Sequence, residues 1–163
     1  MNKTFYQAFY PEGIFVVQEK SPVLLNPEEI EIVKKEITYI GENRKKILIV
    51  IHDRESDTIN EKDKEFLGKI LGAVKLTFND IALVNSFLFP ALHPSDLENK
   101  ISYTKLILFG EELIQLFNDL KLNKYKLSEV NDVEVLYSDS LFEIQEDKTK
   151  KIKLWEELKK MFP

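Results

Sequence analysis

The chain has 163 residues, of which 44% are hydrophobic and 31% charged, and its net charge at pH 7 is −5. This composition is typical of one globular domain and excludes an intrinsically disordered chain. The lack of cysteine excludes disulfides, a thiol nucleophile and thiolate metal sites. The negative net charge disfavours broad binding to nucleic acid, so we expect any contact with nucleic acid to be weak or indirect.

The expected location of the protein is the cytoplasm. A chain without cysteine fits a reducing compartment. Residues 1–13 (MNKTFYQAFYPEG) lack the apolar core of a signal peptide, and no apolar run approaches the roughly 20 residues that cross a bilayer. We therefore expect no contact with a membrane.

The first 25 residues concentrate aromatic and apolar side chains ahead of the periodic part of the chain. These side chains belong to Phe5, Tyr6, Phe9, Ile14 and Phe15. Clustered exposed aromatics are typical of protein interfaces, so residues 1–25 are predicted to be an arm that docks on a partner. The alternative is an arm that covers the edge of a sheet. Residues 26–163 are then expected to form a single α/β domain.

A helix is predicted directly after this arm. Asn26 is a suitable N-cap residue, and Pro27 suits the first helical position. An apolar stripe continues through Ile37 to Ile40, and Gly41 is a suitable residue to end the helix.

Four strands and three further helices are predicted in the rest of the chain. The continuous apolar run Lys46–Ile51 (KILIVI) is typical of a strand buried on both faces, as in a parallel sheet. The other predicted strands are Asp80–Asn85, Leu106–Phe109 and Val133–Tyr137. Amphipathic spacing predicts helices around Phe66–Val74, at Glu111–Leu120 and at Lys148–Phe162. Strands that alternate with helices predict a three-layer α/β/α sandwich, with a central, mostly parallel sheet of about four strands.

Two polar residues at strand ends are the candidates for chemistry. In α/β folds, ligands bind beyond the carboxyl ends of the strands. Asp53 follows KILIVI and would activate water if it were desolvated, whereas Asn85 ends the next strand and is suited to read the edge of a base. The alternatives are a solvated charged loop at 52–60 and an asparagine that bonds to its own backbone. The loop contains no glycine for cradling phosphate, and we expect neither a cofactor nor a metal.

Two other segments have possible roles. His93 lies in the long loop 86–103, where the alternative to a catalytic role is an exposed loop with Ser95 capping the short segment 96–101. In the last helix, one stripe is expected to pack on the sheet; it comprises Ile152, Trp155, Leu158 and Phe162. Lysines at the start of that helix oppose its dipole and indicate either an acidic partner or a solvated face.

The order of these elements resembles the fold of the uracil-DNA glycosylase superfamily. The resemblance runs from Lys46 to the C-terminus and includes the strand that ends in Asn85 and a closing helix with a Leu-Trp pair. Members of that superfamily carry a catalytic acid or asparagine in a loop after the first strand, and a histidine after the last strand. Here HDRESD and the turn Tyr137–Ser140 occupy those places. The resemblance therefore implies a relative of this fold without the catalytic motifs.

The chain also resembles the psi subunit family of bacterial DNA polymerase III, which shares this fold. The similar segments are FYQAFYPEGIFVVQEKSP at 5–22 and SDSLFEIQEDKTKKIKLWEEL at 138–158. The resemblance implies a non-catalytic replication protein whose arm (Phe5, Tyr6, Phe9, Ile14 and Phe15) docks on the clamp loader and whose body binds a chi-like subunit. The alternatives are a divergent glycosylase-like repair enzyme that uses Asp53 and Asn85, and another binding domain of this fold.

Overall fold

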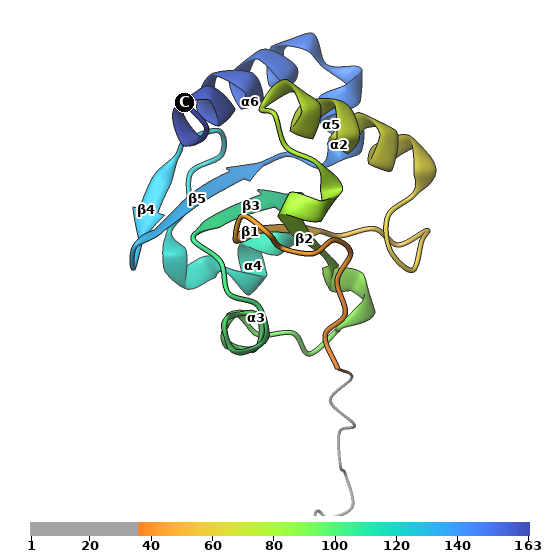
Figure 1. Cartoon of the computed structure of the whole chain (residues 1–163), viewed down its shortest axis with the longest axis vertical. Coiled ribbons are helices and arrows are strands. Elements are labelled where there is room, and N and C mark those ends of the chain that lie inside the picture. The colour runs from red at the N-terminus through yellow and green to blue at the C-terminus, as the bar shows by residue number, and fades with distance from the viewer. Residues whose placement is uncertain (1–35) are drawn as a thin grey trace, which may run out of the picture. The chain divides into compact units, whose positions relative to one another are not determined.

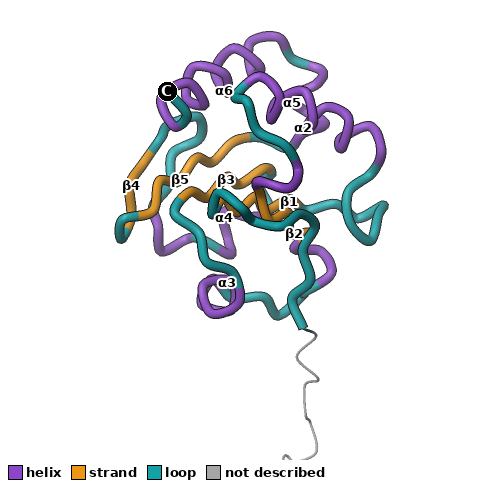
Figure 2. Tube along the Cα trace, in the orientation of Figure 1, coloured by secondary structure: helices purple, strands orange, loops and turns teal. Residues whose placement is uncertain are grey.

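A five-stranded sheet lies at the centre of the computed structural model, which describes residues 36–163 (Figure 1). The strands are β1 (Ile47–Ile51), β2 (Ile81–Asn85), β3 (Lys105–Phe109), β4 (Ser128–Val130) and β5 (Val133–Ser138). The helices are α2 (Glu61–Ala73), α3 (Pro94–Lys100), α4 (Leu113–Leu116), α5 (Leu141–Glu146) and α6 (Lys148–Met161). Figure 2 shows how helices and strands alternate along the chain. The predicted boundary between an arm and a domain lies outside the described residues and stays a prediction.

The sheet is mostly parallel, as the sequence predicts. Its strand order is β2-β1-β3-β5-β4, and only β4 runs antiparallel to its neighbour. In the parallel register, Ile49 lies opposite Leu83 on one side and Ile107 on the other. All four predicted strands are confirmed, as β1, β2, β3 and β5.

The fifth strand, β4, corrects the expected number of strands. It pairs with β5 through a tight turn in which Asn131 and Asp132 have φ angles of 50° and 63°. Asn and Asp tolerate this left-handed conformation, and two such residues are typical of a two-residue hairpin. The Asn-Asp pair between two short β-prone segments was therefore a signal for this hairpin.

Two hydrophobic clusters lie on opposite faces of the sheet. The side chains of Ile47, Ile49 and Ile51 belong to the cluster that α2, α5 and α6 cover. Leu48 and Val50 belong to the other cluster, together with residues of α3 and α4. All five β1 side chains are buried, and each contributes about 1.5–3 kcal/mol relative to an exposed position. The sequence pattern of a strand buried on both faces is thus confirmed.

The helix α5 lies between the last predicted strand and the last predicted helix, where no element is predicted from the sequence. Ser140 caps it: the hydroxyl accepts from the Glu143 N–H at 3.3 Å, and the Glu143 carboxylate accepts from the Ser140 N–H at 3.1 Å. This reciprocal pair is a capping box, which Ser-x-x-Glu in the sequence already contained. Within residues 36–163, no helix has the length and apolar character needed to cross a membrane.

The predicted helix at Glu111–Leu120 is shorter in the structure. Only Leu113–Leu116 is α-helical, and a separate 3₁₀ turn covers Asn118–Leu120. Between them Phe117 leaves helical geometry, and its side chain is buried in the cluster on this face.

The predicted end of the first helix, at Ile40 and Gly41, is wrong. Residues 36–39 are not helical, and Ile40 pairs with Leu83 through two backbone hydrogen bonds of 2.9 and 2.8 Å. This bridge occupies part of the free edge of β2, which lies at one side of the sheet. Gly41 therefore makes a turn beside β2 and does not cap a helix. The residues before 36 lie outside the described part of the chain.

Gly41→Ala is expected to lower the free energy of unfolding by roughly 2–4 kcal/mol. The φ angle of Gly41 is 99°, and a Cβ atom there would lie 2.2 Å from the carbonyl oxygen of Ile81. Urea denaturation followed by circular dichroism measures the loss. The matched control is Gly72→Ala in α2, where a Cβ atom meets no atom within 4 Å. This control should be neutral or stabilising by up to about 1 kcal/mol, and equal losses in both variants would contradict the assignment.

Candidate functional site

Asp53 and Asn85 lie together, as their strand-end positions predict. The parallel register places Ile51 of β1 opposite Asn85 of β2, so Asp53 follows at the same edge of the sheet. The Asn85 side chain is buried, and its Oδ1 accepts from the Asp53 N–H at 3.0 Å and from the Phe87 N–H at 3.2 Å. Its Nδ2 donates to the carbonyl oxygens of Asp53 and Ser56, both at 2.9 Å. The amide is therefore fully used in joining two loops.

The Asp53 carboxylate is also bonded to its own chain. Its Oδ1 accepts from the Glu55 N–H at 2.9 Å. Its Oδ2 accepts from both the backbone N–H and the side-chain amide of Asn60, at 2.8 and 2.9 Å. Asn60 is the N-cap residue of α2, so Asp53 ties the loop after β1 to the start of the next helix. The arrangement stabilises the loop, and both carboxylate oxygens already have donors.

His52 and Ser86 form a second contact between these loops. The Ser86 hydroxyl donates to the carbonyl of Ile51 at 3.0 Å, and it lies 3.0 Å from Nδ1 of His52. Because the single hydroxyl proton is used on Ile51, Nδ1 of His52 is the donor in the second bond. This histidine packs edge-on against the Phe87 ring, with ring centroids 5.6 Å apart.

The turn after β5 contains a buried carboxylate with three cationic or hydroxyl partners. Asp139 pairs with Lys124 and Lys150 and accepts from the Tyr125 hydroxyl at 2.7 Å. Burial by itself would raise the pKa of Asp139, but the bonds from these three groups outweigh it and lower the pKa to about 2. The turn itself has no lysine, and the fold brings both lysines from other segments. Ser138 beside it is buried and bonds to the Leu108 carbonyl at 3.4 Å.

His93 lies apart from this edge. It is the N-cap residue of α3, and its ring Nδ1 lies 2.8 Å from the Ser95 hydroxyl. The helix begins at Pro94, so His93, and not Ser95, caps it. Its exposed position and capping bonds are those of a structural residue in the long loop.

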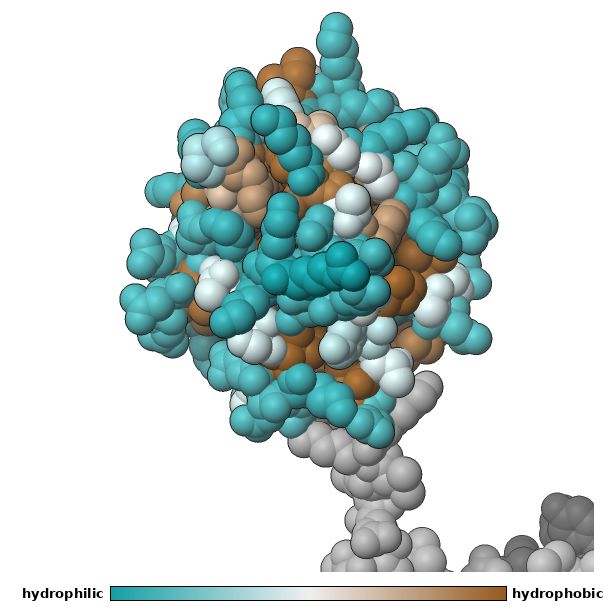
Figure 3. Space-filling model, viewed as in Figure 1, coloured by the Kyte–Doolittle hydropathy of each residue, from teal (hydrophilic) through white to brown (hydrophobic). Residues whose placement is uncertain are grey.

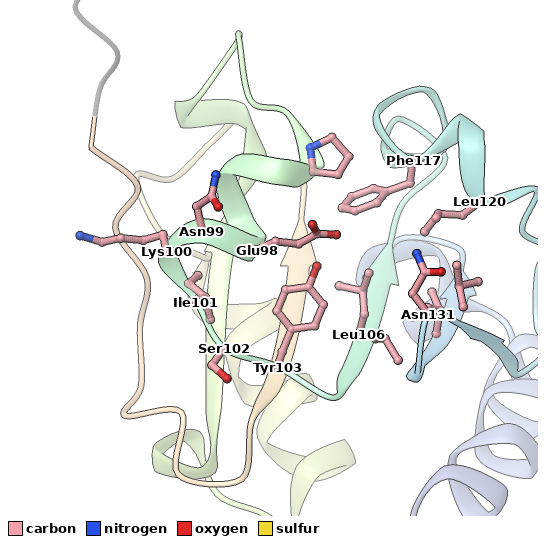
Figure 4. A pocket seen from close by; sticks show the side chains of 14 residues that line it. Glu98, Asn99, Lys100, Ile101, Ser102, Tyr103, Leu106, Phe117, Leu120 and Asn131 are labelled. Carbon is pink, nitrogen blue, oxygen red and sulfur yellow. The ribbon is translucent and has the colours of Figure 1, made fainter.

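An open cavity of about 570 Å³ lies on the sheet face covered by α3 and α4 (Figure 4). Its floor is apolar and includes Leu106 of β3 and Phe117. Its rim carries Glu98 of α3, Tyr103 just before β3 and Asn131 of the β4–β5 turn. In Figure 4 the Tyr103 hydroxyl is directed toward the Glu98 side chain among the residues that line the cavity, whereas Lys100 points away from it.

The polar groups at this rim remain available. No hydrogen bond or ion pair joins the side chains of Glu98, Tyr103 or Asn131 to another residue of the described range 36–163. Burial, and to a lesser extent the charge of Glu98, raise the pKa of Tyr103 to about 12. The phenol is therefore a hydrogen-bond donor at neutral pH. An apolar floor with convergent donors and acceptors is suited to hold a side chain of a ligand or partner.

The face of α6 that packs on the domain differs from the predicted one. Leu158 is buried as expected, but Ile152 and Trp155 are 50% and 38% exposed. The face that packs on the domain is instead Leu154, Glu157, Leu158 and Met161. The spacing of Leu154, Leu158 and Met161 in the sequence was the signal for this face.

The remaining predicted positions have no described structure. Phe5, Tyr6, Phe9, Ile14 and Phe15 all lie outside residues 36–163. Within the described part of the chain, no three histidine or carboxylate side chains lie close enough to hold a metal ion. No protein-family model matches the chain, and no curated protein matches its sequence.

Asn85→Ala should lower the free energy of unfolding by about 2–4 kcal/mol. The change leaves the buried N–H of Asp53 and the carbonyl of Ser56 without their partner. Thermal and urea denaturation measure the effect. The control is Asn123→Ala, at an exposed residue with no side-chain hydrogen bond to another described residue. A loss at Asn85 no larger than that of the control would contradict a structural role for this amide.

Asp139→Asn should reduce stability by about 2 kcal/mol near neutral pH, and this deficit should shrink in acid. The folded-state pKa of Asp139 lies below its ordinary value of 3.8, at about 2. The stabilisation is therefore fully present above about pH 4 and is lost as the pH falls through 2. Urea denaturation between pH 2 and pH 7 measures it. Tyr125→Phe, which removes one donor, should show a smaller deficit of the same sign. A deficit in Asp139→Asn that is independent of pH would contradict the assignment.

Proposed function

We propose that the chain is a non-catalytic interaction subunit of the bacterial replisome, similar to the psi subunit of DNA polymerase III. In this role its arm, residues 1–25, docks on the clamp loader, and its body holds a chi-like subunit. The protein acts in the cytoplasm, needs no cofactor and contacts nucleic acid only indirectly. The fold that accompanies this proposal is a three-layer sandwich of the uracil-DNA glycosylase type. The helices that contribute to the clusters on both sheet faces support that fold.

One contrast carries the proposal. The groups that an enzyme of this fold would need, Asp53 and Asn85, are buried and bonded to their own chain. Glu98, Tyr103 and Asn131, whose side chains have no hydrogen-bond partner within residues 36–163, instead lie at the rim of a cavity with an apolar floor on the side of the sheet. A general base must reach the proton it abstracts, whereas a docking surface needs an apolar centre with a polar rim. The cavity between α3 and α4, with its apolar floor and polar rim, matches the requirements of a docking surface.

The cavity between α3 and α4 is the surface that we assign to the chi-like subunit. Its floor of Leu106 and Phe117 suits an apolar anchor of a partner. The carboxylate of Glu98 and the hydroxyl of Tyr103 would then bond to the polar groups beside that anchor. Leu120 lies in the wall of the cavity and is only partly buried, so it can be changed without opening the core.

The 163-residue chain should capture purified clamp-loader subunits and the chi-like subunit of its own organism in a pull-down. Leu120→Arg is expected to abolish capture of the chi-like subunit, because a charge would lie against the apolar floor of the cavity. The control is Ile152→Arg, the same kind of change at a half-exposed apolar residue of α6. Failure of the unaltered chain to capture either partner would overturn the proposal.

Incubation with uracil-containing DNA tests the enzyme alternative. We expect no release of uracil, because the Asn85 amide is fully bonded within the chain and three backbone or side-chain donors already hold the Asp53 carboxylate. Release by the unaltered protein that is lost in Asp53→Asn would contradict the proposal. Circular dichroism of that variant shows whether it is folded.

A further inference from the structure

A groove rich in lysine runs along the other side of the sheet, between α2 and α6. It consists of two adjoining pockets of about 230 and 490 Å³, which share Ala73 and Trp155 in their walls. We call the two pockets together the lysine groove. Figure 3 shows part of this side of the molecule, where hydrophobic surface lies between hydrophilic side chains. The six lysines that line the groove are Lys45, Lys69, Lys75, Lys105, Lys151 and Lys159.

The charge of the groove is opposite to that of the chain. The chain as a whole has a net charge of −5, but no aspartate or glutamate lines either pocket. Two of the lysines are neutralised, Lys69 by Glu65 and Lys105 by Glu134. The other four lysines have no carboxylate within 4.0 Å among the residues that the structure describes. The groove is therefore a local positive region on an acidic protein.

The smaller pocket is apolar apart from its rim. Its walls are hydrocarbon and aromatic side chains, among them Ile70, Leu154 and Leu158, with Lys69 and Lys151 at the edge. The larger pocket adjoins it at Trp155. It is lined by Phe162 and by four lysines, which are Lys45, Lys75, Lys105 and Lys159. A ligand that fills both pockets thus needs an apolar group at one end and negative charge at the other.

The aromatic rings hold several of these lysines in place. The Nζ atom of Lys159 lies 6.0 Å from the ring centroid of Trp155, and that of Lys151 lies 6.0 Å from the ring of Phe66. Such contacts position an ammonium group without neutralising its charge. Lys151 and Lys159 can therefore still pair with the carboxylates of a ligand. If Lys159 shifts to make such a pair, the surroundings of the Trp155 indole ring change.

We propose that the lysine groove binds a short acidic peptide segment of a partner protein. An apolar side chain of this segment fills the smaller pocket, and its carboxylates pair with Lys45, Lys75 and Lys159 in the larger one. The inference rests on the proposed function, because it names the kind of segment that an interaction subunit holds on this side.

A peptide fits the groove better than a nucleic acid for two reasons. A base in the smaller pocket would bury much of its polar edge against hydrocarbon, because the only side-chain donors in the walls are the rim lysines and the indole N–H of Trp155. A long polyanion would also extend beyond the groove, and the chain as a whole carries a net charge of −5. A short peptide stays within the local field, which extends over roughly 8 Å at physiological ionic strength.

The test uses Trp155, because it is the only tryptophan among the 163 residues. The probe is a capped hexapeptide of four aspartates and two leucines, titrated against tryptophan fluorescence, with calorimetry as a second measurement. We expect saturable binding that weakens with added salt. Peptides with serine in place of the aspartates, or in place of the leucines, should each bind at least about fivefold more weakly.

Charge reversal identifies the surface. The double change Lys75→Glu with Lys159→Glu should weaken binding of the probe peptide about tenfold or more. The control is Lys121→Glu, at an exposed lysine that lines neither pocket of the groove. Equal affinities of the double variant and the control would overturn the inference. So would the absence of binding in both measurements, or tighter binding of a twelve-residue oligothymidylate than of the peptide.

The two proposals fail separately. If the peptide binds and the clamp-loader pull-down fails, the lysine groove stands and the replisome assignment falls. If the pull-down succeeds and the peptide does not bind, the replisome assignment stands and the groove inference is wrong.

Discussion

The central strand β1 is the constraint on which the rest of the domain depends. It is buried on both faces, so its backbone N–H and C=O groups must find partners inside the protein. β2 and β3 supply them on the two sides in parallel register. Parallel neighbours require crossovers, and the helices in these crossovers cover the apolar side chains of β1. The layered arrangement follows from the burial of this one strand.

The same register decides what happens at the carboxyl edge of the sheet. It brings the loop after β1 beside the end of β2, where the Asn85 amide bonds to Asp53 and Ser56. In the same way, the end of β5 presents Asp139 to Lys124 and Lys150. At an edge where α/β proteins commonly bind ligands, these polar groups instead stabilise the loops. The surfaces that we propose for partners lie on the two sides of the sheet, with a carboxylate at the rim of one and lysines along the other.

Two surfaces of different character suit a protein that joins partners. The cavity between α3 and α4 has Glu98 as the acidic group at its rim and Leu106 and Phe117 in its floor. The lysine groove, between α2 and α6, has no aspartate or glutamate among its lining residues. Because the sheet separates them, each surface can select a partner by its own charge. This separation is the physical basis on which we propose a bridging role.

Local sequence signals were enough for elements whose pattern is complete within a few residues. KILIVI predicted β1, and the amphipathic spacing around Phe66–Val74 predicted α2. The hairpin turn at Asn131-Asp132 and the Ser140 capping box were also present in the sequence, but each lies in a segment too short for periodicity to stand out. For residues 36–40 the local pattern predicted a helix and was wrong, because Ile40 pairs instead with Leu83 at the free edge of β2, which is distant in the sequence.

The sequence by itself determined the α/β class, the parallel strands and the absence of thiol chemistry, since these depend on composition and on the spacing of apolar residues. It also placed Asp53 and Asn85 at one edge of the sheet. Only the tertiary structure decided that both are bonded to their own chain, and that no other residue of the described range 36–163 pairs with Glu98, Tyr103 or four of the groove lysines. The reason is that a polar group is free or bonded according to what lies beside it, and those neighbours come from distant parts of the chain.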